Sequence, residues 1–338
     1  MKAVLVRSVD DVAVVETARP VPGPGEIVVA MKAVGICGSD TTPWYVASKA
    51  PVVLGHEPAG VVAEAGALVG AFRAGDRVVV HHHAACGACR FCRAGEDVMC
   101  TEWKKTRLHP GGLAEYVRVE AAAVATDTLR LPDALSFEDG ALVEPLACAV
   151  KAVRRARVVA GDSVAVIGLG ANGILLGLVA RDAGAATLVG CDPDPARRAR
   201  ALRLGFDQVL APEEDLSEKV KRGDRAGADV IFVLPTAESA VASALAAAGP
   251  AARVVFYSPV QPGRMWTIEP HLPYLRDLSM LFSYSSGARD FREALALLER
   301  GAVRAKDLVT HRVPLARAAE AFALARQGGD VLKVVVTF

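Results

Sequence analysis

Short apolar runs separated by proline and glycine fill the first part of the chain. Valine- and isoleucine-rich runs at residues 4–6, 27–29 and 78–80 are bounded by turn-forming stretches such as residues 20–25. Short β-branched runs between turn residues predict strands. Residues 1–150 are therefore expected to form a small, β-rich, barrel-like domain.

A different pattern, in which apolar strands alternate with helices, begins near residue 151. The continuous apolar run at residues 163–167 is followed by a glycine-rich turn and an apolar helix at residues 174–183. Alternating strands and helices predict a parallel sheet, so residues 151–287 are expected to form a doubly wound α/β domain. Its further strands are predicted at residues 186–191, 227–233, 253–257 and 278–284.

The last segment, residues 288–338, changes pattern again. Its apolar spacing predicts amphipathic helices at residues 291–300 and 315–326. Strands are predicted at residues 308–313 and 333–338. We expect this segment to return to the first domain.

Composition and charge exclude several classes of protein. The 338 residues are 52% hydrophobic and 23% charged, which suffices for two buried cores, and the formal net charge is +1. A charge so close to zero argues against a nucleic acid or an acidic membrane surface as partner. The uncharged run at residues 163–180 is interrupted by glycines, so a strand–turn–helix explains it better than a transmembrane span.

The first candidate for chemistry is the dipeptide His56-Glu57, which lies nineteen residues after Cys37 and directly follows Gly55. A thiolate, an imidazole and a carboxylate are the side chains that hold a catalytic zinc while one coordination position stays open. A buried free cysteine and a hydrogen-bonded core histidine are the alternative interpretation. The other motifs of the chain favour the metal site.

Four closely spaced cysteines, Cys86, Cys89, Cys92 and Cys100, form a second candidate metal site. Four thiolates complete a tetrahedral zinc site with no position for substrate, so this zinc would be structural. An iron–sulfur cluster or surface disulfides are the alternatives, but no proline follows Cys100 and the sequence has no second set of cysteines. Because such thiolates persist in a reducing compartment, and residues 1–6 show no secretory signal, we expect a cytoplasmic protein.

Two further features carry metal-binding side chains. The triplet His81-His82-His83 is expected to end a strand, with side chains on alternating faces, rather than to bind a metal. Glu144 lies in an apolar segment with no basic residue before Lys151, and an unpaired buried carboxylate is costly. The alternative for Glu144 is an N-terminal helix acid that the helix dipole favours. We favour a role for Glu144 at the metal site.

A G-x-G-x-x-G motif at residues 168–173 follows the strand at residues 163–167 and opens a helix. Its first glycine makes the turn, the second lets a pyrophosphate approach the backbone, and the third lets helix and strand pack closely. The helix N-terminus adds free N–H groups and the positive end of the helix dipole. The residues expected to bind the dinucleotide are Gly168, Gly170, Ala171, Asn172 and Gly173.

Asp192 ends the next predicted strand, nineteen residues after Gly173, where an acid would hydrogen-bond the adenosine ribose. A carboxylate there repels the 2′-phosphate of NADP, so NAD is expected in preference to NADP. Arg197 and Arg198 could hold a phosphate, or could belong to the solvated first turn of a helix. Adjacent helix residues point about 100° apart, so at most one is expected to turn inward, and Arg197 is included in the candidate cofactor site.

Together these motifs resemble the zinc-dependent medium-chain dehydrogenase/reductase family (the alcohol dehydrogenase superfamily), and most of all its polyol (sorbitol/L-iditol) and threonine dehydrogenase branch. The resemblance covers nearly the whole chain. It implies a GroES-like β fold for the first domain, a Rossmann fold for the middle domain, and an active site in the cleft between them. It rests on residues 35–40, 55–57, 86–100, 143–146 and 168–173, with Asp192.

The resemblance also implies roles for single residues around the catalytic metal. Cys37 and His56 would be zinc ligands, and Glu57 and Glu144 are further candidates, because family members differ in which acid binds the metal.

Ser39 and Asp40 also match residues with roles in the family. By the resemblance, Ser39 would carry the proton away from the substrate alcohol, and Asp40 would orient the ligand histidine. Many relatives have a histidine five residues after the ligand cysteine, which completes a proton relay to solvent, whereas this chain has Thr42 there. The relay must end differently, and an assignment as threonine dehydrogenase is weakened.

The function that the resemblance implies is zinc-dependent transfer of a hydride between a secondary alcohol (a polyol, sugar alcohol or cyclitol) and NAD. Zinc would polarise the substrate oxygen. The alternatives are an NADPH-dependent ketone reductase, a threonine or simple secondary alcohol dehydrogenase, and a non-catalytic structural homologue. We expect a small-molecule substrate, no nucleic acid or membrane partner, and a homodimer or homotetramer.

Overall fold

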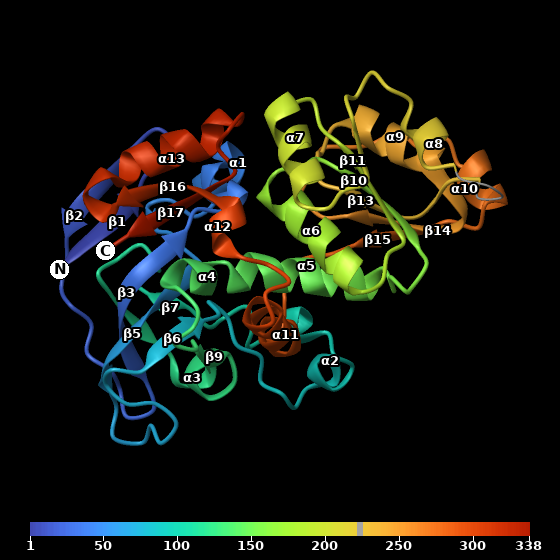
Figure 1. Ribbon diagram of the computed structural model, residues 1–338. Helices are drawn as coiled ribbons and strands as arrows, with labels where there is room; N and C mark the ends of the chain where they lie inside the picture. The colour runs from blue at the N-terminus through green and yellow to red at the C-terminus, as the bar shows by residue number, and fades with distance from the viewer. Residues whose placement is uncertain (222–225) are drawn as a thin grey trace. The chain divides into compact units, whose positions relative to one another are not determined.

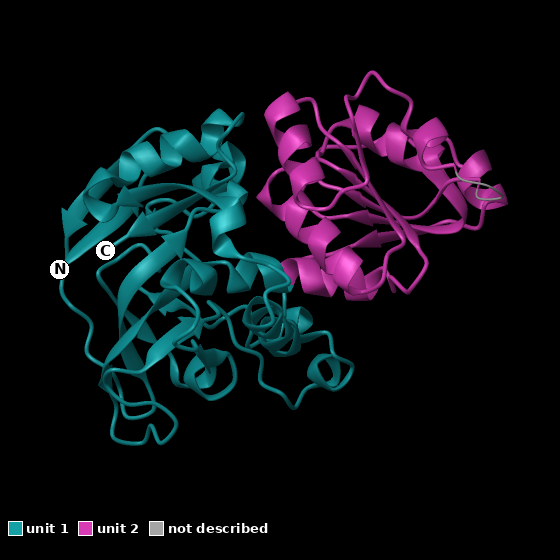
Figure 2. Cartoon of the chain, in the orientation of Figure 1, with its two compact units in different colours: residues 1–147, 286–338 teal, residues 148–285 magenta. Residues whose placement is uncertain are grey.

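The computed structural model describes residues 1–221 and 226–338, which divide into two compact units (Figure 2). Unit 1 comprises Met1–Ala147 and Ser286–Phe338, and unit 2 comprises Cys148–Ser285. The C-terminal segment Ser286–Phe338 thus belongs to the same unit as the N-terminus. Among the described residues, no helix combines the length and the apolar character that crossing a bilayer requires.

Unit 1 is built mainly on antiparallel strands (Figure 1). Its strands are β1 (Lys2–Val6), β2 (Val12–Glu16), β3 (Ile27–Gly35), β4 (Val52–Val53), β5 (Glu57–Ala65), β6 (Arg77–Val80), β7 (Leu108–His109), β8 (Tyr116–Val119), β9 (Thr128–Arg130), β16 (Val309–Pro314) and β17 (Lys333–Thr337). One sheet has the order β2-β1-β4. The larger sheet has the order β16-β17-β3-β5-β6-β9, with β8 paired to β3 and β7 to β8.

Helices of four to twelve residues, and short 3₁₀ helices, lie between these strands. The helices of unit 1 are η1 (Gly38–Thr41), α1 (Pro43–Ala47), α2 (Arg90–Arg93), η2 (Asp97–Met99), α3 (Ala121–Thr126), α4 (Phe137–Ala141), α11 (Ala288–Glu299), α12 (Ala305–Leu308), η3 (Leu315–Arg317) and α13 (Ala318–Gln327). One longer helix, α5 (Val143–Arg155), begins in unit 1 and ends in unit 2.

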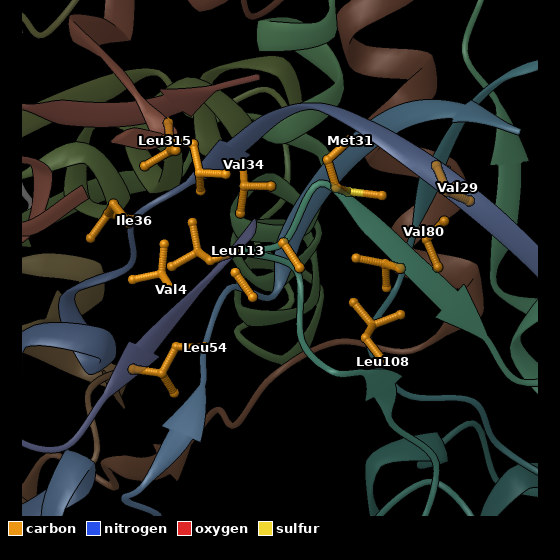
Figure 3. Close-up of a cluster of buried hydrophobic side chains, with 14 of the residues drawn as sticks. Val4, Val29, Met31, Val34, Ile36, Leu54, Val80, Leu108, Leu113 and Leu315 are labelled. Atoms are coloured by element: carbon orange, nitrogen blue, oxygen red, sulfur yellow. The ribbon is translucent and has the colours of Figure 1, made fainter. Parts of the chain in front are cut away.

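The core of unit 1 is aliphatic and draws on strands far apart in the sequence (Figure 3). Val4 of β1, Met31 of β3 and Val80 of β6 are at most 2% exposed, and Leu113 and Leu315 join them. Full burial of such a side chain contributes about 1.5–3 kcal/mol. Both β3 and β5 contribute side chains to this core, and the residues at the adjoining ends of these two strands form the candidate metal site.

Unit 2 contains a six-stranded parallel sheet with the order β12-β11-β10-β13-β14-β15. Its strands are β10 (Ser163–Ile167), β11 (Thr187–Cys191), β12 (Gln208–Leu210), β13 (Ala228–Val233), β14 (Ala248–Phe256) and β15 (Ser279–Phe282). Its remaining helices are α6 (Ala171–Asp182), α7 (Pro195–Arg203), α8 (Leu216–Lys219), α9 (Glu238–Ala247) and α10 (His271–Leu275). In chain order the strands run 3-2-1-4-5-6, the order of a dinucleotide-binding Rossmann sheet.

Helices cover both faces of this parallel sheet. Ala165 and Ile167 of β10 pack in one apolar cluster with Val241 of α9. On the opposite face, α6 lies so close that a Cβ on Gly173 would come within 3.4 Å of Val166. Because neighbouring strand residues point to opposite faces, both faces of β10 are buried, which explains its uninterrupted apolar sequence. The predicted doubly wound α/β fold class is confirmed.

Candidate active site

Strand pairing assembles the first candidate metal site. β3 and β5 are antiparallel with Gly35 opposite Glu57, so residues that follow β3 lie near residues that precede β5. Cys37 lies two residues after β3, at the N-terminal cap of η1, and His56 directly precedes β5. The metal-binding atoms of Cys37, His56 and Glu57 consequently lie within 4.8 Å of one another.

The turn before His56 requires a glycine at position 55. Gly55 has φ = 95°, and a Cβ there would lie 2.7 Å from the backbone nitrogen of Leu113. The Gly55 carbonyl accepts the N–H of Gly112 at 2.9 Å, which ties this turn to the neighbouring segment. The backbone therefore holds His56 in one position.

Asp40 is placed to orient His56. Its carboxylate is 1% exposed, its Oδ1 lies 3.5 Å from Nδ1 of His56, and its Oδ2 accepts the N–H of Cys37 at 3.1 Å. Burial alone raises the pKa of Asp40, but the His56 imidazole and the Cys37 amide outweigh burial and lower that pKa below its usual range. Asp40 is thus a carboxylate facing Nδ1, which leaves Nε2 of His56 available to a metal.

Glu57 forms a buried ion pair that the sequence analysis missed. Lys333, the first residue of β17, donates to Oε1 of Glu57 at 2.6 Å and to the Ile36 carbonyl at 3.1 Å, and it also contacts Oε2 of Glu57. Burial lowers the pKa of Lys333, but Glu57 and Cys37 outweigh burial and raise it above its usual value. A metal held by Cys37 and His56 would therefore compete with the Lys333 ammonium for Glu57. The sequence signal that could have revealed this pair is Lys333 itself, a charged residue at the start of an otherwise apolar strand.

Glu144, on the first turn of α5, lies with two histidines. The metal-binding atoms of His81, His82 and Glu144 are within 4.8 Å of one another. The rings of His56 and His82 have centroids 5.1 Å apart, so this group adjoins the Cys37 site. The histidine triplet was expected to end a strand, but β6 ends at Val80 and the triplet directly follows it. The structure also brings His82 beside a candidate metal ligand.

The hydroxyl groups after Cys37 have different surroundings. Thr41 and Thr42 both donate to the Gly38 carbonyl, at 3.0 and 2.9 Å. Their protons are engaged with the backbone, and Thr42 takes the position where a relay histidine would stand. Ser39, partly buried within η1 and two residues from Cys37, is the remaining candidate for proton transfer in this turn.

The four-cysteine segment folds around α2 and η2 into a second metal-binding group. The thiol sulfurs of Cys86, Cys89, Cys92 and Cys100 lie within 4.8 Å of one another. Burial raises the pKa of Cys100, but backbone hydrogen bonds from Cys86 and Trp103 lower it to about 6, whereas burial and neighbouring thiols raise the pKa of Cys92 to about 12. Four thiolates this close together would repel one another, and a divalent cation with sulfur ligands would offset that repulsion.

In unit 2, the glycine-rich loop joins β10 to α6. Gly168 has φ = 96°, Gly170 is the N-terminal cap of α6, and a Cβ on Gly173 would lie 1.9 Å from the Gly168 carbonyl oxygen. The N–H groups of Ala171 and Asn172 lie in the first turn of the helix, where no intrahelical acceptor exists. The loop and the helix end together can bind a phosphate group.

Asp192 is buried beside this loop at 3% exposure. Its Oδ2 accepts the N–H of Leu169 at 2.7 Å, and its Oδ1 accepts the N–H of Asp194 at 2.8 Å. These two bonds fix the carboxylate at the C-terminal end of β11. It therefore stands where ligands of parallel α/β sheets bind.

The two arginines of α7 point in different directions. Nη1 of Arg197 lies 3.9 Å from Oδ2 of Asp192 and 3.9 Å from the place of a Cβ on Gly170, so this side chain faces the glycine loop. Among the described residues, its Nε has no hydrogen-bond partner. Arg198 instead donates to the carbonyls of Asp192 and Pro193, at 2.6 and 2.9 Å.

Comparison with known proteins places the chain in a family. The model of the alcohol dehydrogenase GroES-like domain matches residues 23–133, and the zinc-binding dehydrogenase model matches residues 171–300. The chain is 32% identical over 339 residues to a protein of Neosartorya fischeri named "Probable D-xylulose reductase A", with coverage of 94% of this chain and 92% of the relative. The chain belongs to the zinc-binding alcohol dehydrogenase family.

Two other members of this dehydrogenase family support the assignment. The L-idonate 5-dehydrogenase of Vitis vinifera is 32% identical, with 94% of this chain and 89% of the relative covered. The crystal structure of a "putative zinc-binding dehydrogenase" from Sinorhizobium meliloti, bound to NADP, has a TM-score of 0.88 and 30% identity, with 100% of this chain and 99% of the other covered. The predicted family, the GroES-like part, the zinc dependence and the dehydrogenase activity are confirmed.

Proposed function

We propose that this dehydrogenase oxidises a polyol, sugar alcohol or cyclitol at a secondary hydroxyl and transfers the hydride to NAD. The observation that carries the proposal is the meeting of the Cys37 thiol and the His56 imidazole, with Asp40 behind His56 and Ser39 on the adjoining turn. Relatives named for D-xylulose and L-idonate, both polyhydroxylated compounds, support this substrate class. In this proposal residues 1–150 and 288–338 form the catalytic domain, and residues 151–287 bind the cofactor.

The donor sets fit zinc at both proposed sites. Cys37 and His56 would hold the catalytic ion with Glu57 or Glu144 as a further ligand, and the four cysteines would hold the structural ion. Bound at the first site, zinc supplies Lewis acidity that polarises the substrate oxygen. Ser39 accepts the proton that leaves the substrate hydroxyl and passes on its own. The substrate carbon loses a hydride to NAD, so the products are a ketone, NADH and a proton.

The proposal is tested with a panel of polyols, cyclitols and simple secondary alcohols, with NAD and with NADP, by absorbance at 340 nm. We expect the highest kcat/KM with a polyol or cyclitol and NAD. A zinc-loaded protein that oxidises none of these compounds, but reduces ketones with NADPH, would make the ketone reductase the better assignment.

Replacement of Ser39 by Ala tests the proton path. The variant is expected to keep zinc and NAD binding but to lose about a hundredfold in kcat, the usual contribution of a general acid–base group. Its pH–rate profile should change as well. Ser48→Ala, which removes an exposed hydroxyl bonded to the Tyr45 carbonyl, is the control and should match the parent. An Ser39→Ala variant with the parent's turnover and profile would mean that the proton leaves by another route.

Replacement of Asp192 by Ala tests the cofactor preference. The parent is expected to prefer NAD, because a 2′-phosphate would meet the Asp192 carboxylate at short range. The variant should shift the NAD/NADP ratio of kcat/KM toward NADP by about 10- to 100-fold, because a ribose hydrogen bond is lost and Arg197 becomes free to pair with the phosphate. Asp207→Ala, which removes a carboxylate that precedes β12 and accepts hydrogen bonds from Arg181 and from the Leu188 N–H, is the control. A parent that prefers NADP, or a ratio that does not move, contradicts this role.

We also propose a cytoplasmic homo-oligomer, a dimer or a tetramer. β15 forms one edge of the parallel sheet, and Phe282 on it is 62% exposed. Tyr274 and Leu275 of α10 are 82% and 63% exposed. An exposed apolar edge strand is a surface that pairs readily with another chain. Phe282→Glu should therefore lower the mass measured by light scattering to that of a monomer. Leu68→Glu, at an exposed apolar residue of unit 1, is the control and should leave the mass unchanged. An unchanged mass in Phe282→Glu would exclude β15 as the subunit interface.

A further inference from the structure

The three histidines after β6 differ in their hydrogen bonds. Nδ1 of His81 bonds the His83 carbonyl at 2.7 Å, and Nδ1 of His83 bonds the Thr106 carbonyl at 2.8 Å. Nδ1 of His82 is also shielded from solvent but has no hydrogen-bond partner among the described residues. His81 and His83 thus have structural partners for a ring nitrogen, and His82 has a free one.

The ring of His82 lies beside the proposed catalytic zinc site. The His82 ring is 5.1 Å from the ring of the proposed zinc ligand His56, centroid to centroid. A ring nitrogen of His82 is also within 4.8 Å of a carboxylate oxygen of Glu144. A buried polar group without a partner costs stability, and at a binding site the missing partner is supplied by the ligand.

We propose that His82 binds the hydroxyl group on the carbon next to the reacting carbon, so that this dehydrogenase selects vicinal diols. A neutral imidazole offers one donor and one acceptor, and a hydroxyl can complement either. The two oxygens of a vicinal diol are about a hydrogen-bond length apart. The rings of His56 and His82 are neighbours, so a diol with one oxygen beside His56 would bring its second oxygen beside His82. Glu144 offers the same hydroxyl an acceptor. This inference rests on the proposed function and adds the substrate feature that the site recognises.

A metal ion held by His81, His82 and Glu144 is the competing explanation, since two imidazoles and a carboxylate are a zinc-binding set. However, both ring nitrogens of His81 already have contacts. Nδ1 bonds the His83 carbonyl, and Nε2 lies 3.4 Å from the Ser286 hydroxyl. The geometry therefore favours a hydroxyl ligand of His82, and metal content distinguishes the two explanations.

The test compares His82→Leu with His82→Asn, two side chains of similar size, of which only Asn can form hydrogen bonds. kcat/KM is measured with NAD for 2,3-butanediol and for 2-butanol, which lacks the second hydroxyl. His82→Leu should lower the diol to mono-alcohol ratio about 10- to 100-fold, and His82→Asn should retain a good part of it. His83→Phe, which keeps an aromatic ring against Trp103, is the matched control and should leave the ratio unchanged.

Three results would overturn the inference. The first is a diol to mono-alcohol ratio that is the same in His82→Leu as in the parent. The second is a ratio that falls as far in His82→Asn as in His82→Leu. The third is the loss of one zinc per chain in His82→Leu, which would make His82 a metal ligand. A zinc-loaded parent that oxidises no member of the alcohol panel contradicts the proposed function itself. A parent that oxidises both butanols with a ratio insensitive to His82 contradicts this inference alone.

Discussion

Replacement of Cys37 by Ser is expected to reduce the zinc content from about two ions to about one per chain and to lower kcat by at least about a thousandfold. Cys37 supplies the thiolate of the proposed catalytic site, and the polarisation of the substrate oxygen by the metal is worth several kcal/mol in the transition state. The remaining ligands, His56 and a carboxylate already paired with Lys333, hold zinc weakly. The measurements are metal analysis and steady-state kinetics.

The Cys37→Ser variant should keep its fold, because the apolar core of unit 1 lies under β3 and β5 and does not depend on this thiol. Its melting temperature should therefore stay close to that of the parent. Cys148→Ser, in α5 and outside both cysteine-containing metal groups, is the control and should retain two zinc ions. Full turnover in Cys37→Ser would refute the active-site assignment.

Replacement of Cys92 by Ser is expected to have the opposite signature. A closed four-cysteine site contributes folding free energy, because the metal binds the folded arrangement and not the unfolded chain. The segment around it has a small apolar cluster of its own, centred on Val98, Cys100 and Trp103. Loss of the metal should lower the free energy of unfolding by several kcal/mol, measured by denaturant titration, or disturb assembly.

The residual Cys92→Ser protein that stays folded should still turn over substrate, with its catalytic zinc in place. Arg93→Ala, which removes an exposed side chain from the same helix, is the control and should have the parent's stability. A Cys92→Ser protein as stable as the parent but inactive would show that the catalytic and structural sites had been assigned the wrong way round.

Local sequence signals were strong enough to predict the α/β fold class. β10 occupies Ser163–Ile167, the same span that was predicted, because a strand buried on both faces has an uninterrupted apolar sequence. The G-x-G-x-x-G loop that follows it was predicted equally well, because each glycine is required by the backbone geometry of a few neighbouring residues. Helix starts were less readable. α6 begins at Ala171, three residues before the predicted helix, because its apolar face begins later than its backbone hydrogen bonds.

The sequence by itself identified which residues can bind metal and cofactor. These are two sets of zinc donors, a glycine-rich loop and an acid after the second Rossmann strand. Only the tertiary structure decided which side chains face one another. Lys333 lies 276 residues from Glu57 along the chain, and the pairing of β17 and β5 with β3 makes them a buried ion pair. His82 likewise meets His56 only through the folded sheet. The physical reason is that electrostatic and hydrogen-bond energies depend on distance through space, which sequence separation does not specify.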